Sequence, residues 1–172
     1  MATDRELLKS AQVGALVSAG LSDPELAVKQ MHRKEYVFFL TDDGDAGTPN
    51  PEMAIPMPVA CRVVSCKVTA PIAVTGHATT NAVFTVAKRT GAGSATTIST
   101  FTTTLSAPAN SLAAFVPAAM TVTAADAVLA ASDVLTCKLT KGSTGVAVTT
   151  AAGDDTAAGS RCTVTVVVEE IG

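Results

Sequence analysis

Aromatic and histidine side chains are scarce in this chain, which removes most of the groups that carry chemistry. Its 172 residues include no tryptophan, one tyrosine, five phenylalanines and two histidines. An active site needs a nucleophile beside a base, or several ligands at metal spacing, and neither His32 nor His77 stands in such a pattern. No serine lies in a G-x-S-x-G elbow. We therefore expect no catalytic residues, no cofactor and no enzymatic activity.

Charge is also sparse, at 16% of residues, and the net charge is −3. Proteins that bind nucleic acid carry a basic face toward the phosphates, so nucleic acid is not an expected partner. Long hydrophobic runs are missing too, since none approaches the roughly 20 apolar residues that span a bilayer. The apolar segment 11–19 differs from a secretory signal because Gln12, Gly14 and Ser18 interrupt it. We expect a protein made in the cytoplasm, with no membrane partner.

Cysteines are too few for a disulfide scaffold in a chain of this length, since there are only four. Cys137 and Cys162 alternate with aliphatic neighbours, and Cys66 shares its strand face with Val64 and Val68. This alternation is typical of side chains that point into a core. It predicts reduced, mostly buried thiols that act as small hydrophobic groups.

Metal ligands at a known spacing are lacking as well. The run DDGDAG, residues 42–47, is the best candidate, because clustered carboxylates attract calcium. It misses the EF-hand pattern, since Ala54 stands where the bidentate glutamate following Asp43 belongs. The run predicts a solvated turn, and we expect no metal site.

Valine and threonine are abundant, in short runs after residue 58. Their β-branched side chains fit a pleated strand, and glycine, proline, asparagine and aspartate separate the runs. This spacing predicts a mainly β fold, an antiparallel β-sandwich of jelly-roll or immunoglobulin-like type. Gly91 and Gly93 predict a hairpin turn, and Phe84, Phe101 and Phe115 are expected in the core. The runs are CRVVSCKVTA, NAVFTVAKRT, ATTISTFTTTLS, SLAAFVPAAMTV, VLTCKLTKG and RCTVTVVVEE.

The first forty residues differ in kind from the rest. Thr3 with Glu6, and Ser22 with Glu25, form two capping boxes that predict two helices. The run EYVFFL, residues 35–40, then predicts a strand rich in aromatic residues. The sequence therefore predicts an N-terminal helical arm that leads into a strand.

Three segments follow from these patterns: an arm and strand at 1–40, a connecting loop at 41–58, and the β-sandwich domain at 59–172. Four prolines and two glycines in the loop predict no regular structure there. The arm is too short to bury a core of its own, so it must dock. The assembly interface that we expect it to bury, against a shell or a sister subunit, consists of Leu7, Leu8, Leu16, Leu26, Tyr36, Phe38 and Phe39.

Two stretches of the β region resemble a known class of proteins. APIAVTGHATTNAVFTVAKRTGAGSATTISTFTTT, followed by ASDVLTCKLTKGSTGVAV, is similar to the Ala/Thr/Gly-rich β domains of auxiliary virion proteins of tailed bacteriophages, the head decoration, cement or fibre class. The resemblance covers roughly residues 69–168 and lies in the amino-acid composition and in the order of the hairpins. It implies a symmetric homo-oligomer, often a trimer, on the outside of a capsid. Its partners would be the major capsid protein and its own copies.

The threonine-rich stretch 96–104 fits this expectation. A strand that is polar but uncharged can lie between two protein surfaces, burying its methyl groups while its hydroxyls find backbone partners. The alternative is a receptor- or glycan-binding module of a phage fibre or a cell surface.

Overall fold

The computed structural model describes residues 32–40, 52–76, 81–104, 110–141 and 162–171. Every regular element in these residues is a β-strand, so none of them lies in a helix long and apolar enough to cross a membrane. The chain divides into two compact units, Met1–Lys34 and Glu35–Gly172. The two predicted arm helices lie outside the described residues, and the fold below is that of the second unit.

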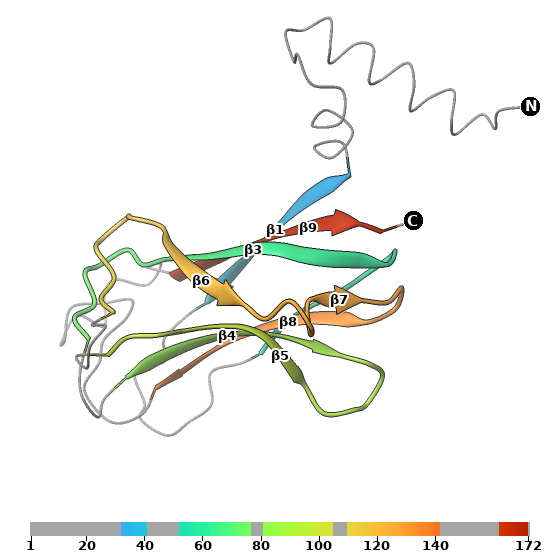
Figure 1. Cartoon of the computed structure of the whole chain (residues 1–172). Coiled ribbons are helices and arrows are strands. Elements are labelled where there is room, and N and C mark those ends of the chain that lie inside the picture. The colour runs from blue at the N-terminus through green and yellow to red at the C-terminus, as the bar shows by residue number, and fades with distance from the viewer. Residues whose placement is uncertain (1–31, 41–51, 77–80, 105–109, 142–161, 172) are drawn as a thin grey trace, which may run out of the picture. The chain divides into compact units, whose positions relative to one another are not determined.

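The described strands form one sheet in the order β1-β9-β3-β6-β5-β4-β8-β2, with β7 paired to β3 (Figure 1). Every pairing that has an assigned register is antiparallel. The mainly β, antiparallel prediction is therefore confirmed. The strands are β1 (Arg33–Leu40), β2 (Met53–Pro56), β3 (Cys61–Thr69), β4 (Ala82–Arg89), β5 (Thr96–Thr102), β6 (Ala118–Val122), β7 (Val128–Leu129), β8 (Val134–Lys141) and β9 (Cys162–Glu170).

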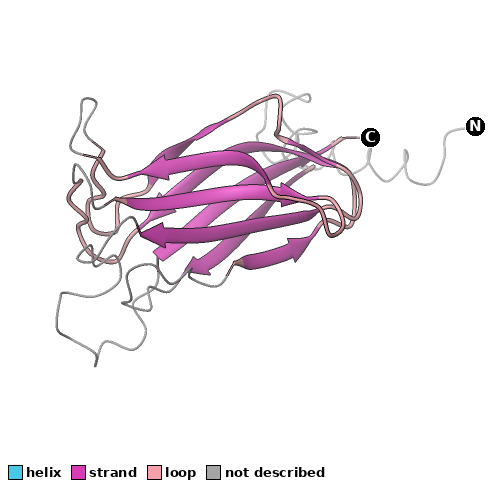
Figure 2. Ribbon diagram, turned by 90° about the horizontal axis from the view of Figure 1, so that it is seen from below, coloured by secondary structure: helices cyan, strands magenta, loops and turns pink. Residues whose placement is uncertain are grey.

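β6 joins the two halves of this sheet. It pairs with β3 on one side, where Cys66 lies opposite Met120, and with β5 on the other, where Ser99 lies opposite Val122. The continuous sheet curls on itself in a nearly barrel-like way, as the two views show (Figures 1 and 2). A jelly-roll or immunoglobulin-like sandwich would have two separate sheets, and that finer assignment stays a prediction.

The core between the two halves consists almost wholly of aliphatic side chains and cysteines. β9 contributes Val164, Val166 and Val168 by strict alternation, each at most 1% exposed. Phe84 on β4 and Leu139 on β8 meet them in the same buried cluster. All four cysteines belong to this cluster and none is in a disulfide. The predicted burial of the thiols is confirmed, and their reduced state stays a prediction.

A β-bulge in β3 changes which valine shares a face with Cys66, so the predicted alternation is wrong at this point. The register of β3 against β9 shifts between Val63 and Ser65. A bulge adds one residue to a strand and so reverses the side-chain alternation beyond it. Cys66 therefore shares its buried face with Val63 and Val68, and Val64 is not part of the buried core.

Two segment boundaries also differ from the prediction. The sequence predicts no regular structure in the loop 41–58, but Met53–Pro56 forms β2, which pairs with β8 at the edge of the sheet. Proline is accepted in an edge strand because no neighbour needs its missing N–H. The predicted strand 35–40 is confirmed and begins at Arg33. It joins the sheet beside β9, so the sheet includes a strand that we had grouped with the arm.

The hairpin between β4 and β5 is confirmed. Gly91 has a positive φ of 58°, which glycine adopts without steric cost. The N–H of Gly93 donates to the carbonyl oxygen of Thr90 at 3.1 Å. The two glycines thus form the turn that the sequence predicts.

We predict that the four thiols are unreactive in the folded protein. Burial raises the pKa of Cys66 to about 11 and also raises the pKa of Cys137, so little thiolate is present at pH 8. An aromatic disulfide reagent should react with almost none of the thiols in the native protein. In denaturant without reductant it should react with all four. A count below four after unfolding would contradict this.

We also predict that Gly76→Ala destabilises the protein. A Cβ at Gly76 would meet the backbone oxygens of Thr104 and Asn110, the latter at 2.7 Å. Backbone atoms cannot step aside as a flexible side chain can, so the free energy of unfolding should fall by roughly 1 to 3 kcal/mol. Gly91→Asn is the control, because no atom lies within 4 Å of a Cβ there and asparagine tolerates its φ. Urea unfolding of both variants measures the difference, and equal stabilities would contradict it.

Candidate functional site

The structure separates the aromatic residues of the predicted assembly interface. Tyr36, Phe38 and Phe39 lie on β1, whose successive side chains point to opposite faces. Phe38 is 1% exposed and belongs to the core of its own chain, so it is not available to a partner. Tyr36 packs partly against that core. Leu7, Leu8, Leu16 and Leu26 lie outside the described residues.

Phe39 does lie on the surface, on the outward face of β1. It is 51% exposed, and Val37 on the same face is 39% exposed. β1 is also an end strand of the described sheet. Among the predicted interface residues that the structure describes, Phe39 is therefore the one that lies exposed. Val37, which the sequence analysis did not include, extends this small apolar face.

A second apolar surface lies in the loop before β6, where the sequence had predicted a strand and a core phenylalanine. Ala113–Pro117 are five consecutive exposed residues, and Phe115 among them is 75% exposed. Leu112 instead fills the core, at 2% exposed, where its backbone pairs with Val74. The prediction of a buried Phe115 is therefore wrong. β6 itself begins only at Ala118.

The backbone of this loop is held in an unusual conformation. Phe115 has a φ of 57°, in the left-handed region that bulky residues rarely adopt, at a cost of about 1 to 3 kcal/mol. Its N–H donates to the carbonyl oxygen of Ala70 at 2.8 Å, and the N–H of Val116 donates to that of Ala113 at 3.2 Å. These bonds fix the backbone that carries the exposed ring.

The sequence segment that contains the loop has no charged residues, and neither does the segment that pairs with it. No aspartate, glutamate, lysine or arginine occurs in residues 68–87 or in residues 90–125. The first of these segments lies beside the loop, because Ala70 forms a bridge with Ala114 and Val74 one with Leu112. We call the residues Ala113–Pro117 the Phe115 loop.

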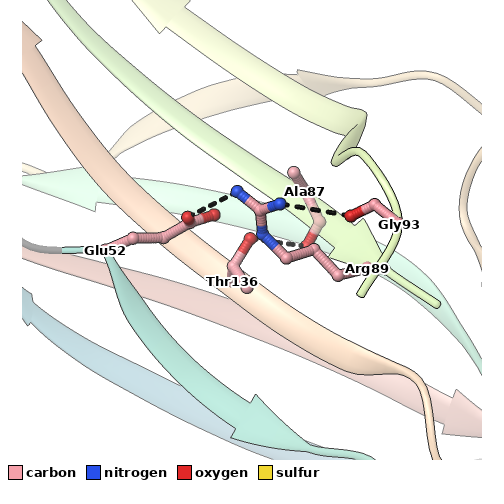
Figure 3. A network of polar contacts seen from close by, with 5 residues as sticks. All are labelled: Glu52, Ala87, Arg89, Gly93 and Thr136. Atoms are coloured by element: carbon pink, nitrogen blue, oxygen red, sulfur yellow. Dashed lines mark hydrogen bonds and ion pairs between the residues drawn. The ribbon is translucent and has the colours of Figure 1, made fainter. Parts of the chain in front are cut away.

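A network of polar contacts lies where β2, β8 and β4 are neighbours. The Arg89 guanidinium donates to a carboxylate oxygen of Glu52 at 2.8 Å and to the carbonyl oxygen of Gly93 at 3.3 Å (Figure 3). The Thr136 hydroxyl donates to the carbonyl oxygen of Ala87 at 3.3 Å. Hydrogen bonding from Arg89 lowers the pKa of Glu52. These contacts tie β2 to the hairpin across β8.

Asp133, buried just before β8, makes a similar structural contact. Its carboxylate accepts from the Thr90 hydroxyl at 2.8 Å and from the N–H of Ala130 at 2.9 Å. These two bonds, with that of Thr90 first, lower the pKa of Asp133. Glu52 and Asp133 thus bond to neighbouring parts of the sheet, so we assign both a structural role.

The other chemical candidates do not gather. In the described ranges no group of three or more His, Cys, Asp and Glu side chains could hold a metal ion. His32 lies in the turn before β1, whereas His77 and the acidic run 42–47 lie outside those ranges. The candidate sites are therefore two separate apolar surfaces, one formed by Val37 and Phe39 on β1 and the other by the Phe115 loop.

Comparison with known proteins adds little to this description. No family model matches the chain, and no curated protein matches its sequence. Solved structures of infectious bursal disease virus, Gx strain and Gt strain, are each similar over 81% of this chain at 13% identity. The TM-scores are 0.28 and 0.27, and the match spans 37% and 36% of those chains. Similarity at this level carries no argument about function.

We predict that Asp133 makes stability depend on pH. A carboxyl whose pKa is lowered by folding stabilises the protein above its ordinary pKa, here 3.8, and this contribution is lost as the pH falls through the lower, folded pKa. Asp133→Asn should therefore lower the free energy of unfolding at pH 7 by roughly 1 to 3 kcal/mol. The difference from wild type should shrink below about pH 4.

Thr90→Val tests the cause of this effect. It removes the hydroxyl that donates to Asp133 but keeps the carboxyl group. Its loss of stability should be smaller than that of Asp133→Asn and in the same direction at pH 7. Urea unfolding from pH 2 to pH 8 measures both, and a difference for Asp133→Asn that stays constant with pH would contradict the prediction.

Proposed function

We propose that the protein is a structural protein of virus particles. In the specific form of the proposal it is a decoration or cement protein that binds the outside of a bacteriophage head and stabilises contacts between major capsid subunits. The observation that carries the proposal is the apolar face of Val37 and Phe39, at the strand where the predicted arm enters the sheet. A β domain with an exposed apolar strand at its entrance is suited to docking on another protein.

The predicted arm belongs to the proposal as well, as a further segment that docks on the shell. The predicted helices of the arm place Leu7, Leu8, Leu16 and Leu26 in the chain just before β1. Fully covering one such side chain contributes roughly 1.5 to 3 kcal/mol. Covering these leucines would offset part of the entropy cost of ordering the arm, which is about 1 to 2 kcal/mol per residue.

The rest of the described surface supports an assembly role more than a catalytic one. The threonine-rich strand β5 lies between β6 and β4 in the sheet. Ile98 and Phe101 on it are buried, whereas Thr100 is exposed on the outer face. Its outer face carries threonines and no charge, which is compatible with a protein contact, because charged residues are depleted in the buried core of interfaces. We propose that the protein acts without enzymatic activity or a cofactor, on the capsid surface, with the major capsid protein and its own copies as partners.

The resemblance of residues 69–168 to auxiliary virion proteins supports the same proposal. We propose in addition that the sheet is of jelly-roll or immunoglobulin-like type. We also propose that the protein forms a homo-oligomer such as a trimer. Synthesis in the host cytoplasm, before attachment to the head, completes the proposal.

A receptor- or glycan-binding module of a phage fibre or cell surface is the second candidate. The exposed ring of Phe115 favours it, because sugar rings stack on exposed aromatic side chains. Ala114 and Val116, the residues on either side of Phe115 in the sequence, have no polar side-chain atoms for sugar hydroxyls. Binding on a glycan array that is lost in Phe115→Ala would favour this candidate over the first.

The proposal predicts that the protein is a component of particles and that β1 holds it there. Purified particles of the virus that encodes the chain should contain it in a fixed ratio to the major capsid protein. Recombinant Val37→Glu and Phe39→Glu should each bind particles lacking the protein at least tenfold more weakly than wild type, because each buries a charge in an apolar contact. Co-sedimentation measures both effects.

Val128→Glu is the matched control. Val128 is 45% exposed on β7, so the same change is made at a valine of similar exposure outside β1. It should bind as wild type does. Absence of the protein from particles, or equal binding by all three variants, would contradict the proposal.

A further inference from the structure

We infer that residues 52–56, which contain β2, form an acid-sensitive strap over the edge of β8. Protonation of two carboxylates, Glu52 and Asp133, releases the strap from that edge. At neutral pH the strap lies closed, as in the structure, and in acid it opens while the rest of the sheet stays folded. The inference concerns a local opening of the sheet, so it goes beyond the proposed function and does not rest on it.

The first observation is how little of β2 is buried. Met53, Ala54 and Pro56 are exposed, and Ile55 is only partly buried. Pro56 also lacks the N–H that a residue in a paired strand can donate. A short strand with few buried apolar contacts opens locally at a small cost in free energy. Polar contacts at its two ends are therefore important for keeping β2 in place.

The contact at the start of the strap is an ion pair. The Arg89 guanidinium on β4 donates to the carboxylate of Glu52, the residue before β2, at 2.8 Å (Figure 3). Because β8 lies between β2 and β4, this ion pair reaches across β8. Lys138 on β8 is a second cation that acts on Glu52. Both cations favour the ionised carboxylate, and protonation removes the charge that they attract.

The end of the strap is bound to a neighbouring turn. Met57, the residue after β2, donates its N–H to the carbonyl oxygen of Asp133 at 2.8 Å. Its own carbonyl oxygen accepts from the N–H of Ser132 at 2.9 Å. Met57 is also 2% exposed and belongs to the core. This end is the more firmly held of the two, so the strap opens from Glu52 first.

The Asp133 carboxylate shapes the turn to which Met57 is bound. It accepts from the N–H of Ala130 at 2.9 Å and from the Thr90 hydroxyl, at the base of the β4–β5 hairpin, at 2.8 Å. Ser132 in this turn has a φ of 75°, a left-handed conformation that the surrounding bonds must maintain. Lys88 on β4 is the charged group that acts on the carboxylate, and it favours the ionised form. Protonation of Asp133 therefore loosens this turn.

The two carboxyl groups set the direction of the pH effect. The bond from Arg89 lowers the pKa of Glu52 from its ordinary value of 4.5. The bond from Thr90 lowers the pKa of Asp133 from its ordinary value of 3.8. Both contributions are complete above these ordinary values and are lost as the pH falls through the lower pKa values of the folded protein. The strap is therefore closed at neutral pH and opens below about pH 4.

Opening of the strap uncovers a long apolar edge. β8 has eight residues, and its side chains Leu135, Cys137 and Leu139 are fully buried. Met53 of β2 lies directly opposite Cys137, so the strap covers this side of the core. Without β2, β8 would offer unpaired backbone groups to another strand. Acid thus changes which strands the sheet can accept.

Hydrogen exchange of the full chain, measured by mass spectrometry and corrected for the intrinsic effect of pH, tests the inference. From pH 7 to pH 3 the opening of residues 52–57 should increase by about tenfold or more relative to that of β9, because two charge-assisted contacts are lost. β9 is the internal reference, since its valines lie in the core. It reports any opening of the whole sheet.

Variants of the ion pair test the cause. Glu52→Gln keeps the shape of the side chain without its charge, so it represents the protonated state. At pH 7 it should increase the opening of β2 by about threefold, and its further increase in acid should be smaller than that of wild type. Arg89→Gln should have a similar effect, and the double variant should open little more than either single variant.

Glu169→Gln is the matched control. It removes the carboxylate of another surface ion pair, Arg62 with Glu169 at 3.3 Å, which joins β3 and β9. Its β2 should exchange as in wild type at both pH values. Asp133→Asn tests the other end of the strap and should increase the opening of residues 52–57 at pH 7.

Four results would overturn the inference. They are an opening of β2 that does not change with pH, an equal increase in β9, an unchanged β2 in Glu52→Gln, and the same effect of Glu52→Gln and Glu169→Gln. The second of these would show that acid unfolds the whole sheet. The last would show that any loss of a surface carboxylate has the same effect.

Discussion

The pairing of β6 on both sides is the constraint on which the rest of the second unit depends. Five residues, Ala118–Val122, close the sheet between β3 and β5. Because hydrogen-bonded strands lie about 4.8 Å apart, this pairing brings the two halves into one curved surface with a shared interior. Met120 lies in that interior, and its strand partner Cys66 does as well. Without β6 the halves would be separate sheets with two more open edges.

The position of β6 also explains the loop before it. Leu112 is anchored to Val74 by a pair of backbone bonds at 2.8 and 2.9 Å, and β6 begins at Ala118. The five residues between must turn from one pairing to the other within a short distance. The left-handed φ of Phe115 makes that turn, and it directs the side chain to solvent. The exposed ring is thus a direct result of how the sheet is closed.

Strand alternation made most of the sheet predictable from the sequence, since valine and threonine at a period of two mark β3, β4, β8 and β9 without ambiguity. It was less informative where a strand is short or irregular. β2 is four residues among prolines and was missed, and the bulge at Val63 exchanged the faces of Val63 and Val64. Phe115 was misplaced because hydrophobicity alone predicts burial, whereas a backbone φ of 57° is set by tertiary pairing. In β1, the alternation of side chains along a strand could have predicted that Phe38 and Phe39 point to opposite faces, so that only one of them is buried.

The two ends of the sheet have a further consequence. β2 is short and ends in Pro56, while β1 begins with the exposed charged residues Arg33, Lys34 and Glu35. Short strands, prolines and charges are the features that keep sheet edges from pairing with other sheets. Crowded copies of this chain would therefore have little tendency to extend into fibres through their edges. Contacts among such copies would instead be made by side chains on other parts of the surface.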